Sequence, residues 1–80
     1  MWQEKDSMLY QKFEFKDFKQ AFDFMKAVAE LAEEQNHHPR WLNEYNQVEI
    51  WLSTHSAGGK VTDKDRKLAA GIDRLYKALI

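Results

Sequence analysis

Apolar side chains alternate with polar ones near the start of the chain. Between residues 9 and 15 the alternation is imperfect, but it is typical of a strand with one buried face. The side chains predicted to share that face are Leu9, Gln11, Phe13 and Phe15. Residues 2–5 can pair with this strand through a turn at Asp6 and Ser7. The first fifteen residues therefore predict a β-hairpin.

The spacing of apolar residues becomes helical after Asp17. The resulting stripe consists of Phe18, Ala21, Phe22, Met25, Val28, Ala29 and Ala32. Asp17, with Gln20 three residues later, resembles a capping box. Pro39 disfavours helical geometry at His38, which precedes it. We therefore predict a helix over residues 18–35.

The chain after Pro39 predicts a second hairpin and a second helix. Residues 41–45 and 48–54 flank Asn46-Gln47, which we take as a two-residue loop. Alternation in the second of these strands buries its even positions and leaves His55 at its end. We expect a mobile loop over residues 56–60. Thr62 and Asp65 then form a capping-box variant before a final amphipathic helix marked by Leu68, Ile72, Leu75 and Leu79.

The predicted order β-β-α-β-β-α indicates an α+β fold. In this fold both helices pack on one face of a four-stranded antiparallel sheet. Eighty residues suffice for a single domain, residues 1–80, but the core of so short a chain is marginal. Without cysteines for disulfides, self-association is a common further support.

Charge and hydropathy exclude several classes of protein. The formal net charge is −1 and no basic stripe is present, which argues against direct binding to nucleic acid. Apolar runs are short and interrupted by charges, and residues 3–6 are polar where a signal peptide would be apolar. We therefore expect no membrane association and a cytoplasmic location.

Three histidines are the main candidates for chemistry. His37 and His38 follow the long helix and His55 follows the last strand, so all three lie where elements end and sites are usually built. Histidine gives and takes protons near neutral pH, so two of them could run an acid–base elimination. The alternative for the His37-His38 pair is that it caps the helix carbonyls. A zinc site fits poorly, because cysteine and the His-Glu-x-x-His spacing are absent, and we expect no metal.

Two carboxylates could support these histidines. Glu33 lies four residues before His37 and could reach its ring if the helix continues that far; otherwise it is a solvated helix charge. Asp65 could assist the site from the start of the last helix, or it could only complete the cap with Thr62.

A combined pattern resembles the pterin-4a-carbinolamine dehydratase family. It consists of Glu33-x-x-x-His37-His38-Pro39, then Trp41, Tyr45-Asn46 and Val48-x-Ile50-x-Leu52-Ser53-Thr54-His55. The similarity extends from Phe13-x-Phe15-x-Asp17-Phe18 through Ala21-Phe22-x-Phe24-Met25 to Asp65 and Leu68-Ala69. The resemblance implies a hydro-lyase that converts 4a-hydroxytetrahydropterin, such as 4a-hydroxytetrahydrobiopterin, to quinonoid dihydropterin and water. Such an enzyme recycles a tetrahydropterin cofactor and uses no cofactor of its own.

The resemblance also implies roles for individual residues. Proton transfer would fall to His37 and His55, while His38 would hold the pterin substrate. Glu33 and Asp65 would be the supporting carboxylates. The residues expected to shape the pterin pocket are Pro39, Trp41, Ser53 and Thr54. Which histidine is the acid and which the base stays open at this stage.

The resemblance also bears on oligomeric state and partners, and two features of this chain differ from the family pattern. Usual members have a helix before the first strand, which we expect this chain to lack, and we expect the loop between His55 and Asp65 to differ in length from that of the mammalian members. The resemblance implies a homodimer or homotetramer with sheets joined edge to edge. Mammalian members are also dimerisation cofactors of a homeodomain transcription factor, so a dimerising interaction module with a protein partner is one alternative. A dehydratase-like protein acting on a molybdopterin-related pterin is the other.

Overall fold

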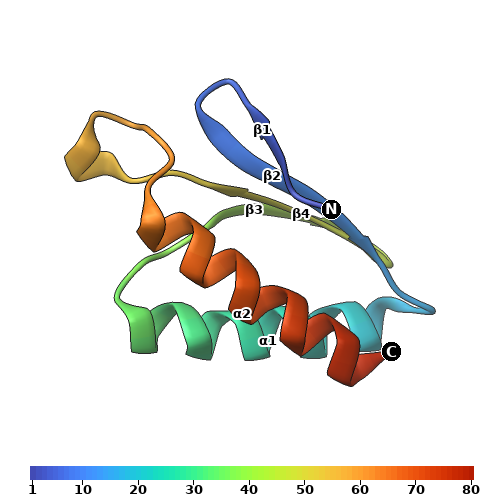
Figure 1. Cartoon of the computed structure of the whole chain (residues 1–80). Helices are drawn as coiled ribbons and strands as arrows, with labels where there is room; N and C mark the ends of the chain where they lie inside the picture. The colour runs from blue at the N-terminus through green and yellow to red at the C-terminus, as the bar shows by residue number, and fades with distance from the viewer.

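The computed structural model describes all 80 residues and confirms the predicted order of elements. The strands are β1 (Gln3–Lys5), β2 (Met8–Glu14), β3 (Arg40–Glu44) and β4 (Gln47–Leu52), and the helices are α1 (Phe18–Gln35), η1 (His55–Ala57) and α2 (Asp63–Leu79). The strands form one antiparallel sheet in the order β1-β2-β4-β3. Both long helices lie side by side under one face of this sheet (Figure 1). The predicted α+β fold class is therefore confirmed.

The core lies between the sheet and the two long helices. Buried apolar side chains come from the alternating positions of β2 and β4 and from one stripe of each helix: Leu9, Phe13, Phe15, Val48, Ile50, Leu52, Ala21, Phe24, Val28, Leu68, Ala69 and Ile72. At Gly71 an added Cβ would stand 2.6 Å from Leu31 Cδ2, so the glycine permits the close approach of α1 and α2. Only one face of the sheet is covered, and the other is open.

Both hairpin turns use left-handed backbone. Between β1 and β2, Asp6 and Ser7 have φ of 53° and 64°, as a two-residue turn that matches the strand twist requires. The β3–β4 loop is Tyr45-Asn46, one residue earlier than the Asn46-Gln47 that we predicted. The side chain of Asn43 accounts for this shift, because its Nδ2 donates to the carbonyl oxygens of Tyr45 and Gln47.

The segment after β4 also differs from the prediction. The strand ends at Leu52 and His55 begins η1, so His55 is not a strand residue. Thr54 N–H donates to Lys60 O, and Gly59 N–H donates to Thr54 O. These bonds close residues 54–60 into a compact loop.

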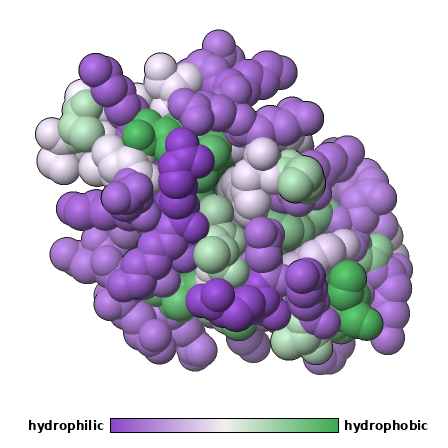
Figure 2. Space-filling view, viewed as in Figure 1, coloured by the Kyte–Doolittle hydropathy of each residue, from purple (hydrophilic) through white to green (hydrophobic).

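Polar side chains cover most of the molecular face seen in Figure 2, and the apolar patches on it are small and separate. Neither long helix is long and apolar enough to cross a membrane.

Candidate active site

The ends of three segments form a polar pocket of about 310 Å³, here called the histidine pocket. The end of α1, the loop with η1 and the start of α2 meet at one end of the molecule (Figure 1). None of the residues that line the pocket is hydrophobic; they are Asn36, His37, His38, Ser53, Thr54, His55, Ser56 and Lys64. The fold thus gathers all three histidines around one hollow.

His37 is held by the buried carboxylate of Asp65. Its Nε2 lies 2.6 Å from Asp65 Oδ1, and its backbone N–H donates to Ala32 O. Asp65 is fully buried, and its other oxygen, Oδ2, accepts from the Thr54 hydroxyl at 2.8 Å and from the Thr62 N–H at 2.9 Å. The proton of the Thr54 hydroxyl is thereby used, so the Thr62 hydroxyl, 2.7 Å away, donates to Thr54. Every buried polar side-chain atom of the network has a hydrogen-bond partner.

The network determines the ionisation of Asp65 and the tautomer of His37. Burial raises the pKa of Asp65, but hydrogen bonds from His37, Thr62 and Thr54, together with the charge of His37, bring it below its ordinary value of 3.8. The carboxylate is therefore ionised near neutral pH and can only accept. It follows that His37 Nε2 carries a proton, and Nδ1 is the nitrogen left for a substrate.

The first alternative for Glu33, a contact with the ring of His37, is wrong. Helix α1 ends at Gln35, and Asn36 adopts left-handed backbone with φ of 52°, which takes His37 off the helix. Spacing by four residues brings side chains together only within a helix. Glu33 Oε2 instead lies 2.5 Å from Nε2 of the exposed His38. Both roles considered for Asp65 are present, because its carboxylate completes the cap of α2 and also binds His37.

The remaining predicted site residues divide into two groups. Ser53, Thr54 and His55 line the histidine pocket with His37 and His38. Pro39 and Trp41 do not line it. Trp41 belongs to a separate hollow of about 150 Å³, where it meets Phe22, Met25, Lys26 and Ala29 of α1, because alternate residues of β3 face the helices. Their predicted part in shaping the pterin pocket stays a prediction.

Three further lining residues were not singled out from the sequence: Asn36, Ser56 and Lys64. Asn36 and Ser56 directly neighbour histidines along the chain. Lys64 carried a stronger signal, because it is a basic residue in the first turn of a helix, where the helix dipole disfavours a positive charge.

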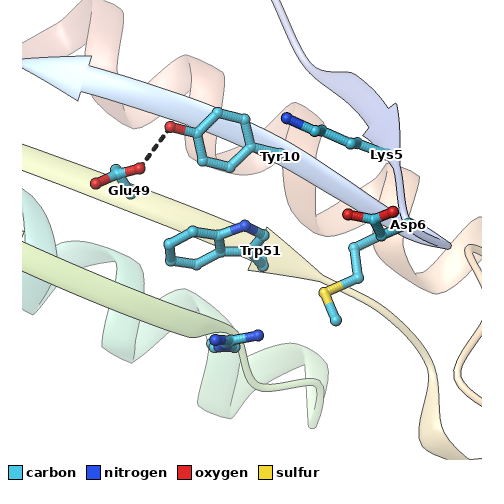
Figure 3. A pocket seen from close by; sticks show the side chains of 7 residues that line it. Lys5, Asp6, Tyr10, Glu49 and Trp51 are labelled. Atoms are coloured by element: carbon cyan, nitrogen blue, oxygen red, sulfur yellow. Dashed lines mark hydrogen bonds between the residues drawn. The ribbon is translucent and has the colours of Figure 1, made fainter.

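A second hollow, which none of the histidines lines, lies on the open face of the sheet (Figure 3). Strand register places Tyr10 and Arg40 on either side of Trp51. The Arg40 guanidinium lies 5.1 Å from the Trp51 ring, and the Tyr10 hydroxyl donates to Glu49 at 2.6 Å. That hydrogen bond, with burial and the charge of Glu49, raises the pKa of Tyr10. This row of contacts crosses the sheet and stabilises it. No histidine lines this hollow, so the histidine pocket is the better candidate for acid–base chemistry.

Comparison with known proteins relates the chain to one family. The model of the family described as pterin 4 alpha carbinolamine dehydratase matches residues 1–75. A protein of Paraburkholderia xenovorans, provisionally named pterin-4-alpha-carbinolamine dehydratase, is 52% identical over 67 residues, which are 84% of this chain and 69% of that protein. A protein of Synechococcus with the same provisional name is 50% identical over 74 residues, 92% of this chain and 78% of its own.

Two solved structures are similar to this one. A transcriptional coactivator/pterin dehydratase from Brucella melitensis superposes with a TM-score of 0.89 at 43% identity, covering 94% of this chain and 81% of that one. A pterin dehydratase-like protein, identified as a RuBisCO assembly factor in the alpha-carboxysome, gives a TM-score of 0.77 at 30% identity over 95% and 87% of the two chains. The family model, the curated relatives and the structural match agree: this chain belongs to the pterin-4a-carbinolamine dehydratase family.

Proposed function

We propose that the protein dehydrates 4a-hydroxytetrahydropterin to quinonoid dihydropterin and water by histidine acid–base catalysis. The observation that carries this proposal is the pairing of His37 with a buried, ionised Asp65 at a pocket that His37 shares with His55. The provisional names of the relatives and the family model support a pterin substrate.

The proposed reaction is an elimination of water: the C4a–O and N5–H bonds break, and an O–H bond and a C4a=N5 π bond form, with no net oxidation or reduction. The C4a–O bond breaks, and the leaving hydroxyl takes a proton and departs as water. N5 loses its proton, and its electron pair forms the C4a=N5 double bond. Because one proton is given and one is taken, two acid–base groups suffice.

The hydrogen-bond partners of the two histidines differ, and we assign their roles on that basis. Asp65 accepts from Nε2 of His37 and can stabilise the positive charge of a ring that carries both protons, so His37 is the acid that donates through Nδ1 to the leaving hydroxyl. His55 takes part in none of the protein's ion pairs and is exposed, so His55 is the base that accepts the N5 proton.

The other lining residues hold the substrate. His38, oriented by Glu33, binds the pterin ring system from the exposed side of the pocket. The Ser53 hydroxyl makes no hydrogen bond within the protein and is available to a polar edge of the pterin. Thr54 acts through Asp65, because its hydroxyl proton is already used there. Pro39 links His38 to β3, whose second residue is Trp41.

The test is decay of freshly generated 4a-hydroxytetrahydropterin, followed by stopped-flow absorbance. The wild type is expected to accelerate the decay, and His37→Ala and His55→Ala each to lower kcat by about 10²- to 10⁴-fold, the usual contribution of a general acid or base. Lys77→Gln, at an exposed position near the other end of α2, is the control and is expected to keep full activity. A wild-type trace equal to the uncatalysed decay would refute the proposal.

A second candidate function, homo-oligomeric assembly of an interaction module, is favoured by an apolar patch on α1. Phe18 and Phe22 are 47% and 46% exposed and stack with their ring centroids 5.7 Å apart. Large exposed aromatic groups of this kind are typical of contact surfaces. The sheet also has two open edges, β1 and β3, which invite pairing.

These surfaces predict two separable contacts. We expect a homodimer through a sheet edge, and a homotetramer if the Phe18–Phe22 patch also pairs. Sedimentation velocity at micromolar concentration measures the state. Phe22→Ser is expected to reduce a tetramer to a dimer, whereas Glu30→Ser, an exposed change on the same helix, leaves it unchanged. A monomeric wild type would contradict both contacts.

A further inference from the structure

Lys64 brings a fixed positive charge to the histidine pocket. Among the eight lining residues it is the only lysine, and no arginine, aspartate or glutamate lines the pocket. The carboxylate of Asp65 lies behind His37 and is occupied by three donors, and Glu33 pairs with His38. Apart from the histidines, the charge that the pocket presents to a ligand is therefore positive.

The ammonium group of Lys64 has no partner in the protein. Lys64 takes part in none of the ion pairs and in no side-chain hydrogen bond. The two nearest aspartates in sequence, Asp63 and Asp65, are adjacent to it along the helix, so their side chains leave in other directions. Lys67, one turn further along α2, has the same charge. No neighbour on its own helix therefore balances this lysine.

The position of Lys64 is fixed although its side chain is exposed. It is the second residue of α2, and its backbone N–H donates to the Thr62 hydroxyl, which belongs to the Asp65 network. The positive end of the α2 dipole opposes a lysine here and adds to its attraction for an anion. A cation held at an unfavourable place beside free hydroxyl and amide groups, Ser53, Ser56 and Asn36, suits an anionic ligand group.

We propose that Lys64 makes the histidine pocket selective for pterins whose 6-substituent carries an anionic group, a phosphate ester or a carboxylate. The inference rests on the proposed function, because it takes the pterin as the ligand of this pocket. It adds a substrate class and a specificity residue. Lys64 binds the anionic substituent and takes no part in proton transfer.

Equilibrium binding of unreactive pterins tests the inference without turnover. The probes are 7,8-dihydroneopterin against its 3′-phosphate, and 6-hydroxymethylpterin against pterin-6-carboxylate, with binding followed by quenching of pterin fluorescence. The two pairs distinguish phosphate from carboxylate. We expect the anionic member of at least one pair to bind about fivefold more tightly than its neutral partner, which is the upper end of the usual range for one exposed ion pair. Raising the salt concentration should reduce this preference.

Lys64→Gln should abolish the preference and leave the neutral probes with unchanged Kd. Lys67→Gln, an exposed lysine on the same helix that does not line the pocket, is the matched control and should keep the preference. Equal weakening of neutral and anionic probes in Lys64→Gln would overturn the inference, because Lys64 would then bind the pterin ring itself. Equal affinity of the wild type for both members of each pair would also overturn it. Failure of all pterins to bind would instead refute the proposed function.

Discussion

Replacing Asp65 by Asn tests the link between the start of α2 and the chemistry of His37. The amide is close in size to the carboxylate, so packing of this fully buried side chain is largely kept. What changes is charge and hydrogen bonding. The single amide oxygen should keep the hydrogen bonds that it accepts from the Thr62 N–H and the Thr54 hydroxyl. The NH₂ group then faces Nε2 of His37. Since two donors cannot bond, neutral His37 must move its proton to Nδ1.

The size of the effect follows from the bond that is lost. A hydrogen bond to a charged group contributes about 1.5–3 kcal/mol, which corresponds to roughly a 10- to 150-fold decrease in kcat if it acts in the transition state. The loss in unfolding free energy should be about 1–3 kcal/mol, which lowers Tm by roughly 4–8 °C for each kcal/mol in a domain of this size.

Three measurements on Asp65→Asn separate these consequences. Stopped-flow kinetics gives kcat across pH, circular dichroism gives Tm, and long-range ¹⁵N–¹H NMR reports which ring nitrogen of His37 is protonated. Asp63→Asn is the matched control, because Asp63 lies in the same first helical turn but is exposed and outside the network. An unchanged tautomer and an unchanged kcat in Asp65→Asn would refute the role assigned to the carboxylate.

Three other outcomes are expected. The pKa of Asp65 in the folded protein is below its ordinary value of 3.8, so the stability that the ionised carboxylate contributes is present above about pH 4 and is lost as the pH falls through the lower folded value. Urea unfolding between pH 6 and pH 2 should show this decrease in unfolding free energy, and Asp65→Asn should make the decrease smaller. His38→Ala should raise KM more than it lowers kcat in steady-state kinetics, and the opposite pattern would place His38 in proton transfer. Glu49→Gln should lower the raised pKa of Tyr10; ultraviolet titration of the three tyrosines measures it, and an unchanged curve would contradict the assigned cause.

Local signals predicted the elements well. Helix α1 begins and ends where its apolar period, the Asp17 cap and the nearby Pro39 indicated, and Asp17 Oδ1 accepts from the Gln20 N–H as a capping residue should. The capping box of α2 was visible from Thr62 and Asp65 alone. These features depend on residues within one helical turn, so a sequence pattern is sufficient to find them.

The contacts inside the site depend on residues distant in sequence and could not be found in this way. Asn36 supplies the left-handed residue that ends α1 and turns His37 toward Asp65, 28 positions later. Spacing along a continuous helix would have paired Glu33 with His37, but the helix stops first. The family resemblance identified most of the residues that line the histidine pocket, whereas Lys64 and its unpaired charge could be recognised only from the folded structure.

The capping of α2 and the orientation of His37 depend on the same carboxylate, and this has a consequence for how the site tolerates change. Oδ2 of Asp65 is held by the Thr62 N–H, so Asp65 cannot rotate toward or away from His37 without uncapping the helix. The orientation of His37 is therefore maintained by the free energy of folding rather than by substrate. Substitutions that disturb this network should lower stability and turnover together. Substitutions of His38 and His55, which are exposed, should lower activity with little loss of stability. A comparison of Tm with kcat across both groups would thus show which part of the site is built into the fold.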